Sequence, residues 1–241
     1  PGNLRFTWIH GSISAKANTD VRIQVHRYNE HTYILRQNPA IHWEAPFMYL
    51  LMGNQQALLL DAGATEEEEF FPLSGVIDGI LQSWAHAHRV EIPDLIVMPL
   101  GSDQSQTAAL DQFAERLETK IFAPGSEARA NVIADQQLDL GGRALTVMPT
   151  PGLNDSAITI YDPWSDLLLT GNTFYPGRLV IRDFDAYRES LQRLVQLAQE
   201  EPISHIFGGR IEMTNRPGLD HRLRSNYRPG EHSLQLEPGL L

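Results

Sequence analysis

The side chains that could do chemistry lie in five short polar segments, each directly after a run of apolar residues. They are Asp61, the segment from Gly101 to Gln106, Gly152-Leu153, Gly171-Asn172 and Arg210. Sites of α/β proteins gather where strands end, so these segments are the candidate site. Asp103 is a candidate general acid or base there, and Arg210 is a candidate contact for an anionic or carbonyl group of a ligand.

Other residue types in these segments predict little chemistry. Ser102, Ser105 and Ser156 are candidate nucleophiles, but a serine nucleophile needs a base within hydrogen-bonding reach. The segments contain no histidine, and the chain has no Gly-x-Ser-x-Gly elbow. His86 and His88 are spaced i, i+2 in a predicted helix and so do not share a face. We interpret them as solvent-exposed and predict no metal site and no cofactor.

Apolar periodicity predicts the elements that position these segments. The first half should hold hairpins over 21–37 and 47–60, helices over 72–89 and 107–117, and strands over 94–98 and 120–123. The second half should hold strands over 144–152, 156–162, 166–172 and 204–210, and a helix over 185–199. Two such halves favour an α/β domain of two sheets packed face to face with helices outside. We expect a single domain over 1–241, with an N-terminal extension over 1–20 and a surface tail over 214–241.

Composition limits the partners. The chain has 241 residues, a formal net charge of −11 and no cysteine. An acidic surface repels phosphate backbones, so we expect no nucleic-acid partner. There is no polybasic segment and no apolar run of the ~18–20 residues that span a bilayer, so we expect no membrane contact. We also expect a cytoplasmic location and a small-molecule ligand. A homo-oligomer is compatible with the sequence.

The five segments, in this order, resemble the hydrolase-like branch of the metallo-β-lactamase superfamily over roughly residues 20–215. The matching runs are LLLDAG at 58–63, LIVMPLGSDQSQTAALDQFA at 95–114, TPGLNDSAITIYD at 150–162, LLLTGNTFYPGRL at 167–179 and SHIFGGRIEM at 204–213. The stretch HTYILRQ…EAPFMYLL, over 31–51, resembles the N-terminal part of that branch. The resemblance implies a four-layer αββα sandwich.

The metal-binding pattern of the family is where the chain departs from the resemblance. The family's loop reads His-x-His-x-Asp-His and holds one or two zinc ions that generate hydroxide. Anchoring on Thr107 puts Gly101 and Asp103 at the first two histidine places, Ser105 at the aspartate place and Gln106 at the third histidine place. Leu153, Asn172 and Arg210 then take the places of the fourth histidine, the bridging aspartate and the last histidine. A rival register puts Asp103 at the aspartate place and Gln104 at the third histidine place, and it too leaves one ligand.

The resemblance also suggests roles for the remaining polar residues. We expect Arg210 to lie near Asp103, Ser105, Gln106 and Asn172, either to fill the former metal site or to contact a ligand. Asp61 supports the metal loop in relatives. Trp43 and Glu44 are plausible at the pocket mouth, although a packed hairpin edge is as good an interpretation. Tyr175 and Arg178 are plausible ligand contacts, although core packing explains Tyr175 equally well.

These observations favour a pseudo-hydrolase, in which the zinc site is lost and a small molecule binds in the former active-site cleft. Two alternatives stay open. One is a metal-independent enzyme that uses Asp103 as acid or base together with Arg210. The other is a metal-dependent hydrolase with atypical ligands.

Overall fold

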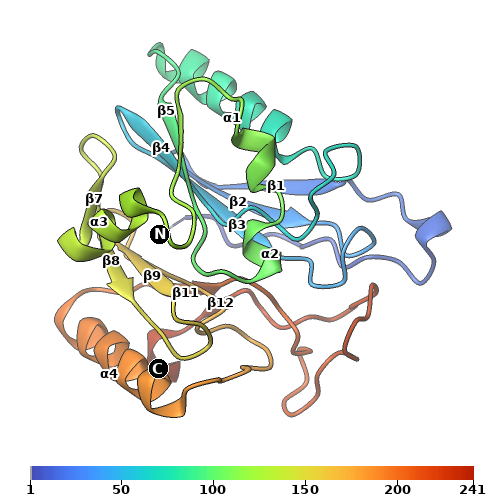
Figure 1. The fold of residues 1–241 in the computed structure, drawn as a ribbon. Helices are drawn as coiled ribbons and strands as arrows, with labels where there is room; N and C mark the ends of the chain where they lie inside the picture. Colours follow the sequence, from blue (N-terminus) through green and yellow to red (C-terminus); the bar gives the residue numbers. More distant parts are fainter. Residues whose placement is uncertain (1) are drawn as a thin grey trace.

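Two six-stranded sheets face each other, and helices cover their outer faces (Figure 1). The computed structural model describes residues 2–241, except for the side chain of residue 15. The first sheet has the order β1 (Ile23–Asn29), β2 (Thr32–Gln37), β3 (Phe47–Met52), β4 (Gln56–Leu60), β5 (Asp94–Met98) and β6 (Thr119–Ile121). β1 to β4 are antiparallel, whereas β5 and β6 run parallel to β4.

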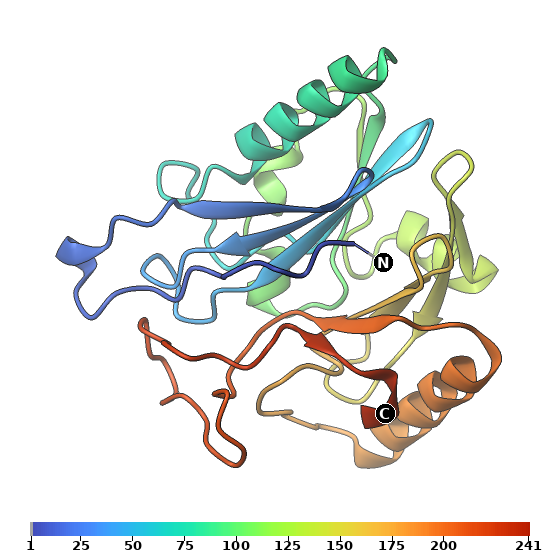
Figure 2. The same ribbon diagram turned by 180° about the vertical axis from the view of Figure 1, so that it is seen from behind.

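The second sheet lies beneath the first and is closed at one edge by the C-terminal tail (Figure 2). Its order is β12 (Gln235–Leu236), β11 (His205–Gly208), β10 (Leu167–Gly171), β9 (Ile158–Asp162), β8 (Ala144–Pro149) and β7 (Gln137–Asp139). The tail also meets the N-terminal extension, because Gly11 and Tyr227 form an antiparallel bridge. A buried ion pair of 2.6 Å joins Arg36 of β2 to Glu231 of the tail.

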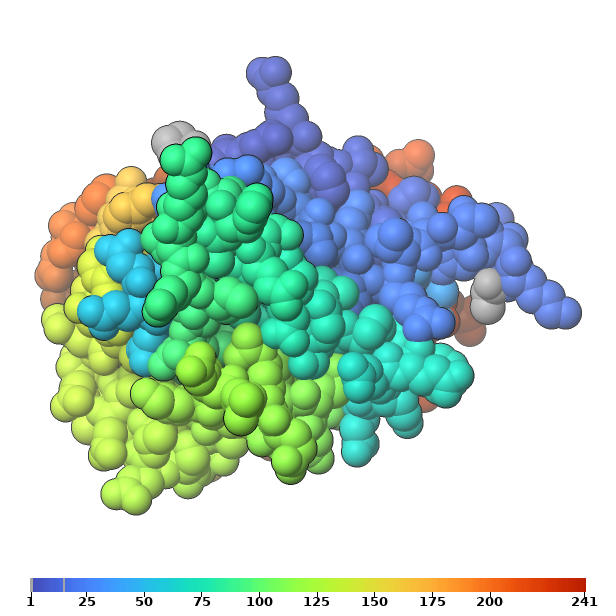
Figure 3. Space-filling view, turned by 90° about the horizontal axis from the view of Figure 1, so that it is seen from above, coloured from blue at the N-terminus to red at the C-terminus, as the bar shows by residue number. Residues whose placement is uncertain are grey.

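The helices divide between the two outer faces. α1 (Leu73–His88) packs on the first sheet, and α4 (Phe184–Glu200) packs on the second. α2 (Gln104–Thr107), α3 (Glu127–Asp135) and the 3-10 turns η1 (Ala15–Ala17), η2 (Leu110–Phe113) and η3 (Pro238–Leu240) are shorter. Seen from the α1 side, the surface is formed mostly by the N-terminal half of the chain (Figure 3). The predicted αββα sandwich is confirmed. None of the helices within 2–241 combines the length and the apolar character needed to cross a bilayer.

Continuous apolar runs produce the layers. Leu58 and Leu60 of β4 point into the core between the sheets, whereas Leu59 points into the core under α1. Leu169 of β10 likewise faces the other sheet, whereas Leu168 faces α4. Because successive side chains of a strand alternate between its faces, a strand covered on both sides must be apolar throughout. Each fully buried leucine contributes on the order of 2 kcal/mol to folding.

The predicted helix over 107–117 is wrong in its bounds. The chain forms α2 at Gln104–Thr107 and then the separate 3-10 turn η2. The cause is tertiary: the Ala108 amide donates to Gly63 and the Ala109 amide donates to Ala62, 3.1 Å away, so both amides are tied to the turn after β4. Helix α3 and strand β7 were not predicted. Helix α1 confirms the prediction over 72–89, and it ends where Arg89 adopts a left-handed backbone (φ 57°).

Candidate functional site

The segments that follow five strands meet at one edge of the sandwich. The Ala62 amide, just after β4, donates to the Gln106 carbonyl at 2.7 Å. The Ile158 amide of β9 donates to the Leu100 carbonyl at 2.8 Å, which ties the loop after β5 to the second sheet. The Gly209 amide, after β11, donates to Gly171, after β10, at 2.6 Å. Backbone hydrogen bonds therefore join the loop after β5 to the turn after β4 and to β9, and they join the loops after β10 and β11 to each other.

Asp61 is buried beneath this edge. Its backbone is left-handed (φ 66°), a conformation that Asp tolerates better than most residues. Its Oδ1 accepts from the Leu100 amide at 2.7 Å and from Gln106 Nε2 at 3.1 Å. Burial raises the pKa of Asp61 to about 7, although these hydrogen bonds and the nearby Arg129 act in the opposite direction. Asp61 thus anchors the loop from below, which fits the supporting role suggested by the resemblance.

Gly101 and Gln106 fit each other. A Cβ atom added at Gly101 would lie 2.6 Å from Gln106 Oε1. The glycine therefore leaves the space in which the Gln106 side chain folds under the loop to reach Asp61. Gly101 and Gln106 align with two histidines of the family's pattern, and a larger residue at 101 would collide with the Gln106 side chain.

Asp103, Ser105 and Asn172 form a second polar group. Asn172 Nδ2 donates to Asp103 Oδ2 at 2.9 Å and lies 3.5 Å from Ser105 Oγ. Asn172 and Ser105 are buried, whereas Asp103 is partly exposed. This contact joins the loop after β5, in the first sheet, to the loop after β10, in the second. The expected proximity of Asp103, Ser105 and Asn172 is present in the structure.

Arg210 pairs with a different carboxylate from the one we expected. Its Nη1 donates to Glu44, and its Nη2 donates to the Tyr175 hydroxyl at 3.1 Å. Its guanidinium lies over the Tyr175 ring, 5.0 Å from the ring centroid. Arg210 and Glu44 are 13% and 15% exposed. The expectation of an Asp103–Arg210 pair is therefore corrected: within the described residues Glu44 is the ion-pair partner of Arg210, and Asn172 takes the contact with Asp103.

Arg178, Tyr175 and Trp43, which we predicted as ligand contacts or pocket residues, instead interact with the C-terminal part of the chain or with each other. Arg178 forms ion pairs with Glu212 at 3.5 Å and Asp220 at 3.3 Å, and Tyr175 donates to the Arg178 carbonyl at 2.6 Å. The Trp43 carbonyl accepts from Arg228. Burial raises the pKa of Tyr175 to about 12 despite the nearby Arg210. The hydroxyl of Tyr175 therefore stays protonated and acts as a hydrogen-bonding group.

Known structures share this arrangement of layers. A metallo-beta-lactamase from Pontibacter korlensis superposes with a TM-score of 0.57 at 16% identity, over 85% of this chain and 96% of that one. The DIM-1 metallo-beta-lactamase exposed to ceftazidime gives 0.57 at 10% identity, over 80% and 91%. The enzyme from Hirschia baltica gives 0.56 at 10% identity, over 79% and 91%. The chain has the metallo-β-lactamase fold.

Sequence comparison adds one curated relative. Acyl-coenzyme A thioesterase MBLAC2 of Gallus gallus is 31% identical over 94 residues, which are 37% of this chain and 34% of that protein. The match thus spans about a third of the relative's length. No family model matches the chain.

At the positions that our alignment matches to the family's metal ligands, the side chains do not supply three zinc donors. Asp103 is the one carboxylate among the side chains aligned with ligands, Leu153 is buried and apolar, and Arg210 carries a positive charge. Catalytic zinc sites take three N, S or O ligands from the protein. Within residues 2–241, the one group of three His, Asp or Glu side chains with donor atoms within 4.8 Å of one another lies elsewhere. The residues at this edge do not fit the ion.

An open cavity of about 500 Å³ borders this edge beside Gln104, the first residue of α2. Its polar lining comes from His42, Thr65, Glu66, Glu67 and Gln104, and Phe70 supplies an aromatic wall. The segment that we expected at the pocket mouth is present, but it contributes His42 instead of Trp43 and Glu44. The cavity is therefore acidic and has both polar and apolar walls.

The group that sequence analysis missed is Glu30, His31 and His88. Glu30 and His31 form the turn between β1 and β2, and His88 is the last residue of α1. Our interpretation of His88 as solvent-exposed is corrected, because its Nε2 atom is buried. The spacing to His86 misled the prediction, since the neighbours of His88 come from a turn more than fifty residues away in the sequence.

Proposed function

We propose that this metallo-β-lactamase-fold protein binds a small molecule at the edge beside α2 and uses no metal ion in the former active-site cleft. The observation that carries the proposal is the contact of Asn172 Nδ2 with Asp103 at 2.9 Å. An amide N–H group points toward the one carboxylate at the metal positions. A cation bound by that carboxylate would meet the positive end of the amide dipole.

Two further features support this proposal. Gln106 directs its Nε2 group toward Asp61, so a second N–H group lies where the family's pattern has a metal ligand. The guanidinium of Arg210 is held by Glu44 and Tyr175. Its nitrogens are all donors and have no lone pair to offer a metal ion.

The lining of the cavity indicates the ligand class. Glu66 and Glu67 are acidic, Gln104 and Thr65 offer neutral polar groups, and Phe70 offers a ring face. Carboxylates attract cationic groups, and aromatic faces bind both apolar groups and ammonium ions. We therefore propose a small molecule that carries an amine and a short apolar part. The volume of about 500 Å³ suits such a ligand.

A metal analysis paired with a binding screen tests this proposal. Metal content per chain should be the same in the wild type and in Asp103→Asn, because Asp103 holds no ion. A thermal-shift screen of small amines should give stabilising compounds, since any ligand of the folded state alone raises the melting temperature. Glu66→Gln/Glu67→Gln should remove those shifts, whereas Glu91→Gln, on the exposed loop after α1, should keep them. Metal that is bound by the wild type and absent from Asp103→Asn would overturn the proposal.

A second candidate is thioester hydrolysis, which the 31% identity to an acyl-coenzyme A thioesterase favours. Without metal, Asp103 is the group that could act as a base on water. Acyl-coenzyme A should then be hydrolysed in the presence of a chelator, and Asp103→Asn should lower the rate by 10²–10⁴-fold. Turnover that requires added metal would return the protein to the metal-dependent hydrolases.

A further inference from the structure

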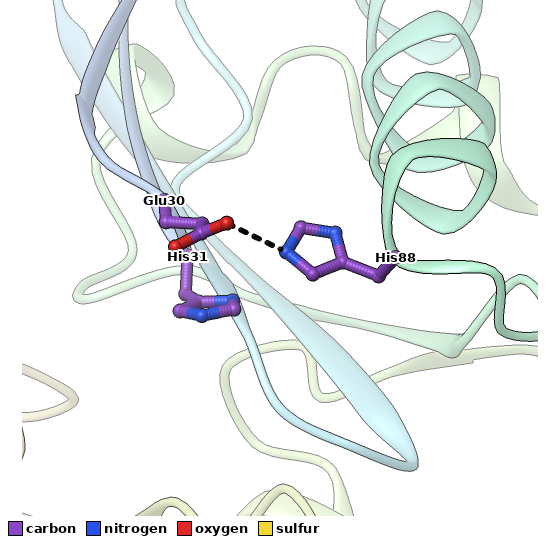
Figure 4. A group of neighbouring side chains, drawn as sticks. All are labelled: Glu30, His31 and His88. Carbon is purple, nitrogen blue, oxygen red and sulfur yellow. Dashed lines mark ion pairs between the residues drawn. The ribbon is translucent and has the colours of Figure 1, made fainter.

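Glu30, His31 and His88 form a cluster between the β1–β2 turn and the end of α1 (Figure 4). The Met52 amide donates to the His31 carbonyl at 2.9 Å, so the β1–β2 turn is next to the end of β3. β4 starts near this turn and ends at Asp61, under the cleft. The cluster is therefore separate from the proposed ligand site by the length of a strand.

The donor atoms are close enough for one ion. One ligand atom from each of Glu30, His31 and His88 lies within 4.8 Å of the others, and His88 Nε2 is 3.2 Å from Glu30 Oε1. Bonds of 2.0–2.2 Å in a tetrahedral zinc site place neighbouring ligand atoms about 3.4 Å apart. The His88–Glu30 distance already meets this value. Glu30 is 62% exposed, so its side chain is free to move toward His31.

The hydrogen bonds of His88 leave its Nε2 atom available. Its Nδ1 lies 2.8 Å from the Trp84 carbonyl, which can only accept, so Nδ1 carries a proton and donates. Its Nε2 is buried, has no hydrogen-bond partner within the described residues and lies 3.2 Å from Glu30 Oε1. A carbonyl that orients the far nitrogen of a histidine is the usual support for a metal-binding imidazole.

His31 can also supply a lone pair without leaving a buried group unpaired. Trp84 Nε1–H lies 3.2 Å from His31 Nδ1 and 3.2 Å from the Glu30 carbonyl. The indole N–H only donates, so His31 Nδ1 is an acceptor. If His31 Nδ1 binds an ion, the indole keeps the Glu30 carbonyl as its partner.

We propose that Glu30, His31 and His88 bind one divalent transition-metal ion of the zinc, cobalt or nickel class. Two imidazole nitrogens and a carboxylate oxygen suit these ions, and the remaining positions are open to water. The neighbouring cations do not block the site: Arg27, 4.0 Å from Glu30, is 58% exposed, and Arg143 is paired with Asp162 at 2.5 Å. The ion ties the β1–β2 turn to the end of α1. This inference is independent of the proposed function.

Titration of the tag-free, chelator-treated protein with cobalt and zinc chlorides tests the inference. We expect one equivalent of ion, a cobalt absorption spectrum of tetrahedral type and a rise in melting temperature. His88→Gln and Glu30→Gln should each weaken binding at least tenfold. The control is His86→Gln, which changes an exposed histidine two residues away on the same helix and should bind as the wild type does. Each variant is compared with its own metal-free form, so a loss of folding stability does not imitate a loss of binding.

Each other outcome of the titration has a distinct meaning. No binding at millimolar ion, or unchanged affinity in both His88→Gln and Glu30→Gln, would overturn the inference and leave the proposed function intact. Binding that survives His88→Gln but is lost in Asp103→Asn would place the ion in the cleft and overturn both. Binding lost in His88→Gln and retained in Asp103→Asn supports both.

Discussion

The amide of Asn172 and the carboxylate of Asp103 join the two sheets across the candidate site, with 2.9 Å between Nδ2 and Oδ2. Each residue follows a strand of a different sheet, so the contact fixes one end loop against the other. Asn172 is buried and Asp103 is partly exposed. An interaction of this kind with a charged acceptor contributes about 1.5–3 kcal/mol.

Asn172→Asp should test that contact through charge. The change replaces the donor by a second carboxylate next to Asp103, and two adjacent carboxylates cannot both ionise without repulsion. We expect a loss of about 1–3 kcal/mol of unfolding free energy at pH 8, and a smaller loss at pH 5, where the pair can share a proton. Urea unfolding at both pH values measures it. Asn172→Ala is the control, because it removes the donor without adding charge. The same pH-independent loss in both variants would contradict the prediction.

Asp61 should make stability depend on pH. Its pKa is raised to about 7 in the folded protein, so between pH 4 and 7 the folded state keeps a proton that the unfolded chain has released. The contribution of Asp61 to stability is therefore fully present below pH 4 and is lost as the pH rises to 7. A shift of this size corresponds to on the order of 4 kcal/mol.

Asp61→Asn should remove that dependence. The asparagine keeps the hydrogen bond from the Leu100 amide through its Oδ1. Gln106 now turns its Nε2 toward this position, so its amide must turn over to offer the new N–H₂ group its Oε1, which has no partner within the described residues. Measured by urea unfolding, the variant should gain stability relative to the wild type between pH 4.5 and pH 8. Parallel stability curves for the two proteins would show that Asp61 keeps an ordinary pKa.

Arg210 and Glu44 should be energetically coupled. Both side chains are mostly buried, so the removal of either one leaves the other poorly solvated. Arg210→Met and Glu44→Gln should each lower the unfolding free energy by about 1–3 kcal/mol, and the double variant should lose less than the sum. A double-mutant cycle measures this. Loss of ligand affinity in Arg210→Met at unchanged stability would instead indicate that Arg210 contacts the ligand.

Gly152→Ala should be strongly destabilising. Gly152 has φ 137°, and a Cβ atom there would lie 2.6 Å from the Cα atom of Tyr187 in α4. The α4 backbone cannot move aside as a flexible side chain could, so we expect a loss of more than about 3 kcal/mol. The matched control is Gly79→Ala in α1, which has nothing within 4 Å and should gain about 0.5–1 kcal/mol. Thermal unfolding of both variants, with a similar loss in each, would contradict this account.

The sequence predicted the strands and the layers, because these depend on patterns of neighbouring apolar residues. Runs such as Leu58 to Leu60 are apolar on both faces, and two successive halves of strands followed by a helix predicted the two facing sheets. Side-chain partners were harder to predict. Arg210 pairs with Glu44 because the tertiary structure brings the loop before β3 next to it, and the sequence alone does not show this contact. Helix α3 has no marked apolar face in its sequence and is held by the buried Arg129, which donates to the Ser156 carbonyl at 2.7 Å.

Arg143, in the second half of the chain, donates hydrogen bonds to residues of the first sheet. Arg143, just before β8, donates to the carbonyls of His31 at 2.8 Å and Met52 at 3.1 Å and to the Thr32 hydroxyl at 2.9 Å. A fragment that ended before Arg143 would leave these three acceptors without that donor, and such groups are costly when water cannot reach them. We therefore expect the two halves to unfold as a single cooperative unit. Calorimetry should show one transition, with equal calorimetric and van't Hoff enthalpies.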